Sequence, residues 1–216
     1  MGYPMTFFVM LILGFGIGSI PFGLIVAKLM LGIDIRKQGS GNIGMTNVMR
    51  VGGKLPGILT FLLDFAKGSV MMMIAEPWLF DSSGNGSIVQ WSCVGIATVS
   101  GHIFSIFLKF KGGKGISTLF GILAILNLSI GLIAAFLWVG TFLAKQISSL
   151  AALVMLAGLP FLFLLVPWMS GENISLGQFF LFSGLSALII FRHRENIDRL
   201  LRGEEKQLKT VRQSHS

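Results

Sequence analysis

The stretch ISTLFGILAILNLSIGLIAAFLWVGTFLA, residues 116–144, decides how often this chain crosses a membrane. It is longer than the roughly 20 apolar residues that one transmembrane helix needs. Two polar residues, Asn127 and Ser129, interrupt it near its middle. One interpretation is a single long, tilted helix, and the other is two short helices that turn at 127–129. The charges elsewhere in the chain distinguish these two interpretations.

The composition of the chain places most of it in lipid. The 216 residues are 53% hydrophobic and only 12% charged, and the mean hydropathy is +0.81. A soluble globular domain typically has about 25% charged residues, so water cannot be the main solvent of this surface. We predict an all-α integral membrane protein, with a single domain over residues 1–203 and a polar cytoplasmic tail over 204–216. The clear candidate spans are 4–27, 55–76, 88–108, 150–167 and 176–191.

The basic residues of the chain predict its orientation. They gather in residues 28–54, 109–114 and 192–216, and Lys145 stands between the second and third groups. Cytoplasmic loops collect Lys and Arg, so an even number of crossings should separate the second group from the third. This favours two helices within 116–144, although both would be short for a hydrocarbon core of about 30 Å. We predict seven transmembrane helices, with the N-terminus outside and the C-terminus in the cytoplasm. The net charge of +8 is then an orientation signal, and no nucleic-acid partner is expected.

Three polar segments lie on this predicted cytoplasmic side. We name them loop 1 (QGSGNIGMTNVMRVGG, 38–53), loop 2 (KFKGGKG, 109–115) and loop 3 (RHRENI, 192–197). Successive glycines let backbone N–H groups point together at an anion, and the planar fork of Arg suits phosphate. Helices that begin just after Gly115 and within Asn47–Val51 would add the positive ends of their dipoles. The loops therefore predict a phosphate or carboxylate site at the cytoplasmic interface, with turns plus orientation charges as the alternative.

Several motif matches in these loops indicate no function by themselves. Gly39–Gly44 fits the dinucleotide pattern GxGxxG, but a membrane helix precedes it where that fold requires a strand. Loop 2 lacks the Ser or Thr that follows the lysine of a P-loop. His193 and Asp198 have the HxxxxD spacing of soluble acyltransferases, yet on one helix they would point roughly 140° apart. No metal-type Cys/His cluster accompanies the single Cys93, so no metal is predicted.

Two ionisable residues, Asp64 and Lys67, lie within a predicted span and three positions apart on one helical face. Such residues usually face the protein interior. We favour a self-neutralising pair that holds spans together over a direct functional role. His102, in the cytoplasmic half of its span, is interpreted as a packed helix histidine, with catalysis as the alternative.

The first span carries two packing signals. Gly14 and Gly18 form a GxxxG pattern, which favours close approach of another helix. Pro21 lacks a backbone N–H and is expected to kink the span.

Four ordered motifs carry a resemblance to a known family. They are GSIPFG (18–23), SGNIGMTNVMR (40–50), FKGGKG (110–115) and HRENI (193–197). With them the chain resembles, over nearly its whole length, the bacterial membrane-integral acyl-phosphate:glycerol-3-phosphate acyltransferase family. Met45 departs from the family, which usually has alanine there, and we expect an altered contact rather than lost activity.

The resemblance implies a reaction in phospholipid biosynthesis. A fatty acyl group would pass from a long-chain acyl phosphate to the sn-1 hydroxyl of glycerol 3-phosphate, giving 1-acyl-glycerol 3-phosphate (lysophosphatidic acid) and inorganic phosphate. The family is similar in having seven spans and needs no metal, no cofactor and no acyl-carrier protein. It implies a multi-pass protein of the bacterial inner (plasma) membrane, in contact with membrane lipid, whose active site faces the cytoplasm.

The resemblance also implies roles for individual residues. The substrate- and phosphate-binding residues of loop 1 would be Ser40, Gly41, Asn42, Gly44, Thr46, Asn47 and Arg50. The amides of Gly112, Gly113 and Gly115 would cradle the other phosphate beside Lys114. Lys114, His193 and Asn196 are the expected catalytic residues, and Ser149, beside Lys145 at a cytoplasmic helix start, would join the glycerol 3-phosphate site.

The sequence leaves open which group is the general base, and it leaves two alternatives to the acyltransferase function. His193 is the residue of the motifs best suited to titrate near neutral pH, but a phosphate oxygen of a substrate could equally accept the hydroxyl proton. An organic-phosphate transporter is the rival function, and a non-catalytic scaffold is a third. Against a transporter, Asp64 and Lys67 are the only charges expected to be buried, and no inverted repeat is visible.

Overall fold

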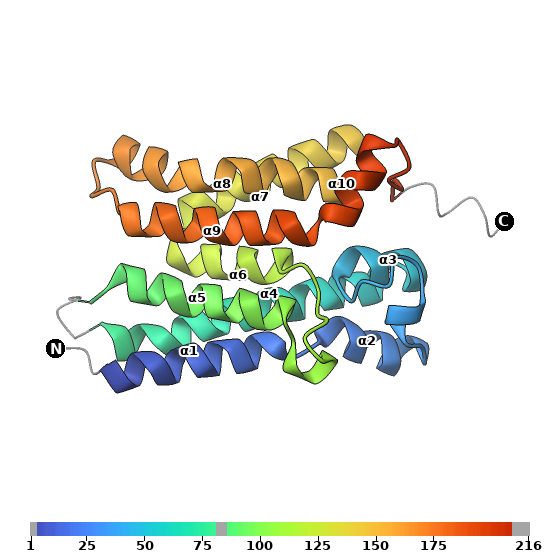
Figure 1. Ribbon diagram of the computed structural model, residues 1–216, viewed down its shortest axis with the longest axis horizontal. Helices are drawn as coiled ribbons and strands as arrows, with labels where there is room; N and C mark the ends of the chain where they lie inside the picture. Colours follow the sequence, from blue (N-terminus) through green and yellow to red (C-terminus); the bar gives the residue numbers. More distant parts are fainter. Residues whose placement is uncertain (1–3, 81–85, 209–216) are drawn as a thin grey trace. The chain divides into compact units, whose positions relative to one another are not determined.

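The computed structural model describes residues 4–80 and 86–208, and apart from an isolated bridge between Phe80 and Gly86 every regular element there is a helix (Figure 1). The helices form two compact units, residues 1–127 and 128–216. The first unit contains α1 (Pro4–Ser19), α2 (Phe22–Leu31), η1 (Ile35–Lys37), α3 (Met45–Gly52), α4 (Lys54–Leu79), α5 (Ile88–Ile103), η2 (Ile106–Leu108) and α6 (Ile116–Leu126). The second contains α7 (Leu128–Lys145), α8 (Ser148–Ser170), α9 (Leu176–Arg192) and α10 (Arg194–Leu201). Within the predicted tail, residues 209–216 lie outside the described residues.

The described helices confirm the prediction of an all-helical chain with apolar spans. Five segments are long and apolar enough to cross a membrane, and the pair α9 and α10, bent by 61°, would be a sixth. The five are Met5–Leu31, Lys54–Leu79, Ile88–Leu108, Leu128–Lys145 and Ser148–Ser170. Each clear candidate from the sequence coincides with one of these segments or with α9.

The ambiguous stretch 116–144 forms two helices, so the single-helix interpretation is wrong. Helix α6 ends at Leu126, Asn127 has an extended backbone (φ −160°, ψ 102°), and α7 begins at Leu128. The 11 residues of α6 and the 18 of α7 correspond to about 16 and 27 Å at 1.5 Å per residue. Helix α6 is therefore short for a span, as the sequence predicted.

The first span breaks at the predicted proline. Helix α1 ends at Ser19 and α2 begins at Phe22, with Pro21 between them. A proline cannot donate a helical hydrogen bond, and the Ile17 carbonyl, four residues before Pro21, accepts from the Ile20 N–H at 3.2 Å. The Ile20 carbonyl accepts a 3.0 Å hydrogen bond from Lys67 Nζ on α4, which links the break to the interior of the first unit.

Glycines let the helices of the first unit approach closely. A Cβ at Gly18 of α1 would overlap the Thr98 carbonyl of α5, and a Cβ at Gly101 of α5 would overlap the Phe15 carbonyl of α1. Figure 1 shows these two helices side by side. Gly14 also lies against Thr98, so the close packing predicted from the GxxxG pattern is confirmed.

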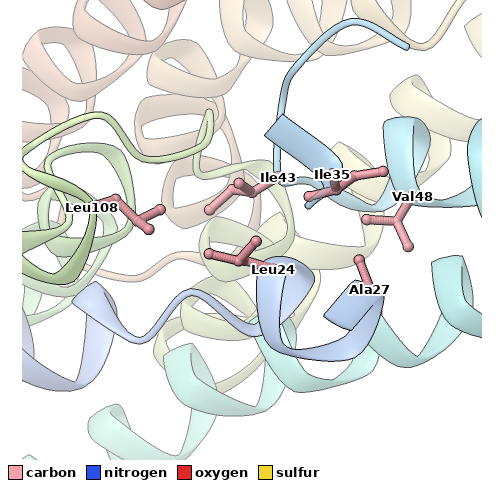
Figure 2. Close-up of a cluster of buried hydrophobic side chains, with 6 residues drawn as sticks. All are labelled: Leu24, Ala27, Ile35, Ile43, Val48 and Leu108. Carbon is pink, nitrogen blue, oxygen red and sulfur yellow. The ribbon is translucent and has the colours of Figure 1, made fainter. Parts of the chain in front are cut away.

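A small apolar cluster supports the polar loops of the first unit (Figure 2). It joins α2, η1, loop 1, α3 and η2, and its buried members are Leu24, Ala27, Ile35, Ile43, Val48 and Leu108. Full burial of a leucine, isoleucine or valine side chain stabilises the folded state by about 1.5–3 kcal/mol. The cluster therefore holds loop 1 and the approach to loop 2 on a common base.

The second unit has its own core along α8. Helix α8 packs against both α7 and α9, and the rings of Phe163 and Phe182 stack with centroids 4.1 Å apart. Ser149 lies one residue into α8, which confirms its predicted place at the start of a helix. The elements that carry Ser149 and loop 3 are thus held together by one apolar core.

Candidate active site

Loop 1 is organised by the buried side chain of Asn47, at the start of α3. Its Oδ1 accepts from the Ser40 N–H at 2.8 Å, and its Nδ2 donates to the carbonyls of Asn42 (2.9 Å), Gln38 (3.0 Å) and Ile35 (3.4 Å). Only 2% of Asn47 is exposed. The carboxamide thus forms its hydrogen bonds with the backbone of loop 1 and of η1 just before it. The direct phosphate or glycerol contact implied for Asn47 by the family resemblance stays a prediction.

Other predicted residues of loop 1 also take part in its internal structure. Asn42 Oδ1 accepts from the Gly44 N–H at 3.0 Å, and the Gly41 N–H donates to the Gln38 carbonyl at 2.9 Å. Helix α3 begins at Met45, slightly earlier than the predicted start within 47–51. The side chain of Ser40 is exposed, whereas Thr46 and Arg50, both on α3, are half-buried.

Just before loop 1, Asp34 and Arg36 form a tight ion pair. Arg36 Nε donates to Asp34 Oδ1 at 2.9 Å, and the Arg36 N–H also donates to that oxygen at 3.1 Å. The side-chain hydrogen bond from Arg36 holds the pKa of the Asp34 carboxyl well below its usual range, and the same bond raises the pKa of Arg36. The guanidinium therefore stays charged and oriented at the edge of the loop.

Loop 2 folds back onto the end of α5 by main-chain hydrogen bonds. The Gly112 N–H donates to the Ile103 carbonyl at 3.0 Å, and the Gly113 N–H donates to the His102 carbonyl at 3.1 Å. These two amides are thus used within the protein, and the phosphate cradle implied for them stays a prediction. Gly115 (φ 85°) directly precedes α6, so the predicted helix start after loop 2 is confirmed.

The turn that begins loop 2 is strained. Lys109 and Phe110 have left-handed backbone conformations, with φ of 53° and 62°. Each such non-glycine residue costs on the order of 1–3 kcal/mol, and such strain tends to occur at functional sites. The Phe110 N–H donates to the Ser105 carbonyl at 2.8 Å, which holds the turn in place.

Loops 1 and 2 meet at a basic pocket of about 380 Å³ in the first unit. It is lined by Arg36 and Gly41 before and within loop 1, and by Phe107, Leu108, Lys109 and Lys111 at loop 2. Three of these six residues are cationic. The structure thus brings together two of the loops that the sequence placed on one side, and the cationic walls of the pocket suit an anion.

Loop 3 belongs to the second unit, where it joins α9 to α10. His193 is 2% exposed, and its Nδ1 lies 2.8 Å from the Ile189 carbonyl. Because a carbonyl can only accept, Nδ1 carries the hydrogen and Nε2 carries the lone pair of the neutral ring. Asp198 is exposed while His193 is buried, as expected from the separation predicted for the HxxxxD pattern.

A carboxylate that the sequence reasoning missed connects Ser149 with Asn196. Glu205 Oε1 accepts from Ser149 Oγ at 2.7 Å and from Asn196 Nδ2 at 2.6 Å, and Oε2 accepts from Arg199 Nε at 2.6 Å. Glu205 lies within residues 204–216, which the sequence predicts to be a polar cytoplasmic tail. The available signal was Gly203, which has φ 71° and turns the chain back towards α8.

Burial by itself would raise the pKa of Glu205. The hydrogen bonds from Ser149, Arg199 and Asn196 outweigh it and lower the pKa below its ordinary value of 4.5. A carboxyl with a lowered folded-state pKa stabilises the protein above its unfolded-state pKa and loses that contribution as pH falls through the folded-state value.

We expect Glu205→Ala to lower the Tm of the purified protein at pH 7 by roughly 10 °C or more. It removes three charge-assisted hydrogen bonds, each of which contributes about 1.5–3 kcal/mol, and 1 kcal/mol shifts Tm by about 2–4 °C in a protein of this size. The difference from wild type should shrink as the pH is lowered beneath 4.5. The matched control is Glu204→Ala, because Glu204 is 60% exposed and its carboxylate lies 3.9 Å from Arg202. Equal melting temperatures for the two variants at pH 7 would contradict this role.

The geometry defines a class of protein: an all-helical membrane protein whose cationic, glycine-rich loops line a site suited to a phosphate. The chain belongs to the glycerol-3-phosphate acyltransferase family, whose model matches residues 8–203. It is 42% identical over 196 residues to the glycerol-3-phosphate acyltransferase of Aquifex aeolicus (strain VF5), with 91% of this chain and 96% of that protein covered. It is also 41% identical over 197 residues to glycerol-3-phosphate acyltransferase 2 of Thermotoga maritima, with 91% and 94% covered.

The fold is similar to two crystal structures of PlsY (YgiH), an integral membrane glycerol 3-phosphate acyltransferase. The TM-score is 0.80 for its glycerol 3-phosphate form and 0.78 for its lysophosphatidic acid form. In both comparisons the identity is 37%, and 93% of this chain and 94% of the PlsY chain are covered. The resemblance inferred from the four motifs is therefore confirmed, and the chain is an acyltransferase by family.

Proposed function

We propose that the protein transfers a fatty acyl group from a long-chain acyl phosphate to the sn-1 hydroxyl of glycerol 3-phosphate. The products are 1-acyl-glycerol 3-phosphate (lysophosphatidic acid) and inorganic phosphate. The observation that carries the proposal is the likeness, over 93% of the chain, to PlsY in a glycerol 3-phosphate form and a lysophosphatidic acid form.

The chemistry of this donor fits a site built from cations. The sn-1 oxygen forms an ester bond with the acyl carbon, the anhydride C–O bond breaks, and phosphate leaves with the electron pair. An acyl phosphate has a good leaving group, so the protein's contribution is positioning and charge stabilisation. We assign this role to Lys114 and Arg50, with Ser40, Asn42, Thr46 and Gly115 placing the phosphates. The residues whose amides or carboxamide are used within the protein would support the loops, and these are Gly41, Gly44, Asn47, Gly112 and Gly113.

The proposal includes the topology inferred from charge. The chain crosses a bacterial inner membrane seven times, residues 1–203 act as one domain, and the site faces the cytoplasm beside membrane lipid. The single cysteine makes this testable. In a Cys93→Ser background, an impermeant thiol reagent added to intact cells should label Glu172→Cys and leave Glu204→Cys unlabelled until the membrane is opened. The reverse pattern would invert the topology.

His193, on the second unit, is the candidate general base that accepts the sn-1 hydroxyl proton. Ser149 and Asn196, on the same unit, would help to bind glycerol 3-phosphate. The Nδ1 hydrogen bond to Ile189 places the lone pair of the neutral ring on Nε2, the nitrogen that a general base must use. A phosphate oxygen of a substrate is the alternative acceptor for the sn-1 proton.

If His193 is the base, we expect His193→Ala to lower kcat by about 10²- to 10⁴-fold and to change the pH profile. Wild-type kcat should fall on the acidic side of its profile, where a histidine base becomes protonated and can no longer accept the proton. The variant should lose that acidic limb. Profiles of kcat between pH 5 and 9 measure this, and an unchanged shape in the variant would assign the proton to a substrate phosphate.

One assay distinguishes the proposed function from a transporter. Purified protein is mixed with palmitoyl phosphate and glycerol 3-phosphate, and phosphate release is followed. We expect release that requires both substrates. No release, combined with glycerol 3-phosphate uptake into proteoliposomes, would replace the acyltransferase by an organic-phosphate transporter, and neither activity would leave a scaffold.

A further inference from the structure

A buried charge cluster lies beneath the polar loops of the first unit. Lys67 Nζ is 2.8 Å from Asp64 Oδ1 within α4, which confirms the predicted pair, and 2.8 Å from His102 Nδ1 on α5. Asp64 is 1% exposed, and Lys67 and His102 are each 4% exposed. The histidine that the sequence left between packing and catalysis is thus the third member of an ionic cluster.

Burial of three ionisable side chains costs free energy, so the cluster stabilises the packing of α4 against α5 only weakly. Ionisable groups lose much of their hydration free energy on burial, and a buried ion pair is often no more stabilising than apolar residues of similar volume. Stability alone is therefore a weak reason for the cluster. Its contacts point instead to the two loops above it.

Lys67 connects the cluster to the base of loop 1. Its third contact is the Ile20 carbonyl at 3.0 Å, at the break where α2 begins. Helix α2 contributes Leu24 and Ala27 to the apolar base of loop 1 (Figure 2). A Cβ at Gly23 of α2 would also overlap the Ile43 carbonyl of loop 1. The ammonium thus fixes the start of the helix on which loop 1 rests.

His102 connects the cluster to loop 2. An ammonium only donates, so His102 Nδ1 accepts from Lys67, and the opposite ring nitrogen, Nε2, faces Gly113. A Cβ at Gly113 would overlap that Nε2. The main chain adds to this contact, because the Gly113 N–H donates to the His102 carbonyl. The side chain and the carbonyl of one residue therefore set the position of the glycine that precedes Lys114.

We propose that Asp64, Lys67 and His102 are positioning residues that hold loops 1 and 2 in register, with the His102 ring as the support beneath Gly113 and Lys114. The inference rests on the proposed function, in which Lys114 acts on a substrate phosphate. His102 does not touch substrate in this arrangement. It acts through the loop that carries the catalytic cation.

The test uses size complementarity between His102 and Gly113. His102→Asn keeps a polar atom near the position of Nδ1 for Lys67 but removes the ring edge under the loop. We expect KM for one phosphate substrate to rise about tenfold while KM for the other changes less than about threefold. Gly113→Ala should lower kcat/KM by about 100-fold, and adding His102→Asn to it should restore about tenfold, because the clash is gone.

The control is Trp91→Phe, which removes a buried 2.9 Å hydrogen bond between α5 and the Met72 carbonyl of α4 without touching either loop. It should lower Tm and leave both KM values unchanged. If His102→Asn behaves like this control, and the double variant is no more active than Gly113→Ala, the cluster only holds helices and the inference is overturned.

The melting temperature separates failure of this inference from failure of the proposed function. The loss of Tm caused by Gly113→Ala should be smaller in the His102→Asn background than in wild type, whatever reaction the protein catalyses. An additive loss would overturn the contact. If wild type releases no phosphate from the two substrates, the proposed function fails, and the Tm coupling still decides whether His102 supports the loop.

Discussion

Lys114→Ala is expected to lower kcat/KM by about 10³-fold while the protein remains folded, because removal of a single charge-stabilising donor typically costs about 10²–10³-fold. Lys114 lies between Gly113, which the end of α5 holds in place, and the start of α6. We propose its ammonium as the cation of loop 2 that acts on the departing phosphate. Arg50→Ala, at the end of α3, should have a similar effect through the other phosphate. Steady-state phosphate release measures kcat/KM of the two variants, and circular dichroism in detergent shows whether they remain folded.

The matched control for these losses of charge is Lys54→Ala. Lys54 is exposed at the first position of α4 and belongs to the same basic region of the chain. It should retain activity within about threefold of wild type. Wild-type-like turnover in Lys114→Ala or Arg50→Ala would remove the proposal that these two cations serve the two phosphates.

Asn47→Ala is expected to abolish activity by a different route, through the collapse of loop 1. The change removes four hydrogen bonds and leaves buried carbonyls and an amide without partners. Each unsatisfied buried group costs about 1–3 kcal/mol, so Tm should fall by roughly 5–10 °C. Asn47→Asp should not rescue the loop, because a carboxylate cannot donate to the three carbonyls. Thermal unfolding with parallel kinetics measures the effect.

Gln38→Ala provides the comparison for Asn47. Gln38 is exposed, and its backbone carbonyl accepts from Asn47. Truncation of its side chain should leave Tm and turnover near wild type. Full activity in Asn47→Ala with an unchanged Tm would show that loop 1 does not depend on this side chain, and would return Asn47 to the direct substrate role predicted from the sequence.

The sequence predicted the features that depend on local chemistry. The position of the break at Asn127 follows from a polar residue in an overlong apolar stretch, once the charges elsewhere favour two helices, and the break at Pro21 follows from its missing N–H. The Asp64–Lys67 pair follows from helical spacing. In each case the residues involved lie within one helix or at its end, so their relation depends on helix geometry rather than on the rest of the fold.

The hydrogen-bond partners of the loops could not be predicted from the sequence. The family resemblance implies a phosphate or glycerol contact for Asn47, but nothing local shows that its carboxamide reaches back to Ile35. Likewise, nothing local shows that the Gly112 and Gly113 amides donate to the Ile103 and His102 carbonyls, because that return of the chain is a tertiary event. A glycine-rich loop predicts close backbone approach, but the approaching group can be another part of the protein.

The sequence by itself determined that this protein is a membrane protein, that it is helical, and to which family it belongs. Apolar content, charge placement and ordered motifs are properties of residue order, and they hold before any two distant segments meet. Only the tertiary structure decided which polar atoms are available for a ligand. Helix α5 packs against α4 and α1, and at its end the His102 carbonyl accepts from the Gly113 N–H. The turn at Gly203 brings Glu205 to Ser149 and Asn196. A hydrogen-bonding group satisfied inside the protein is lost to the substrate, and which groups are satisfied depends on long-range contacts.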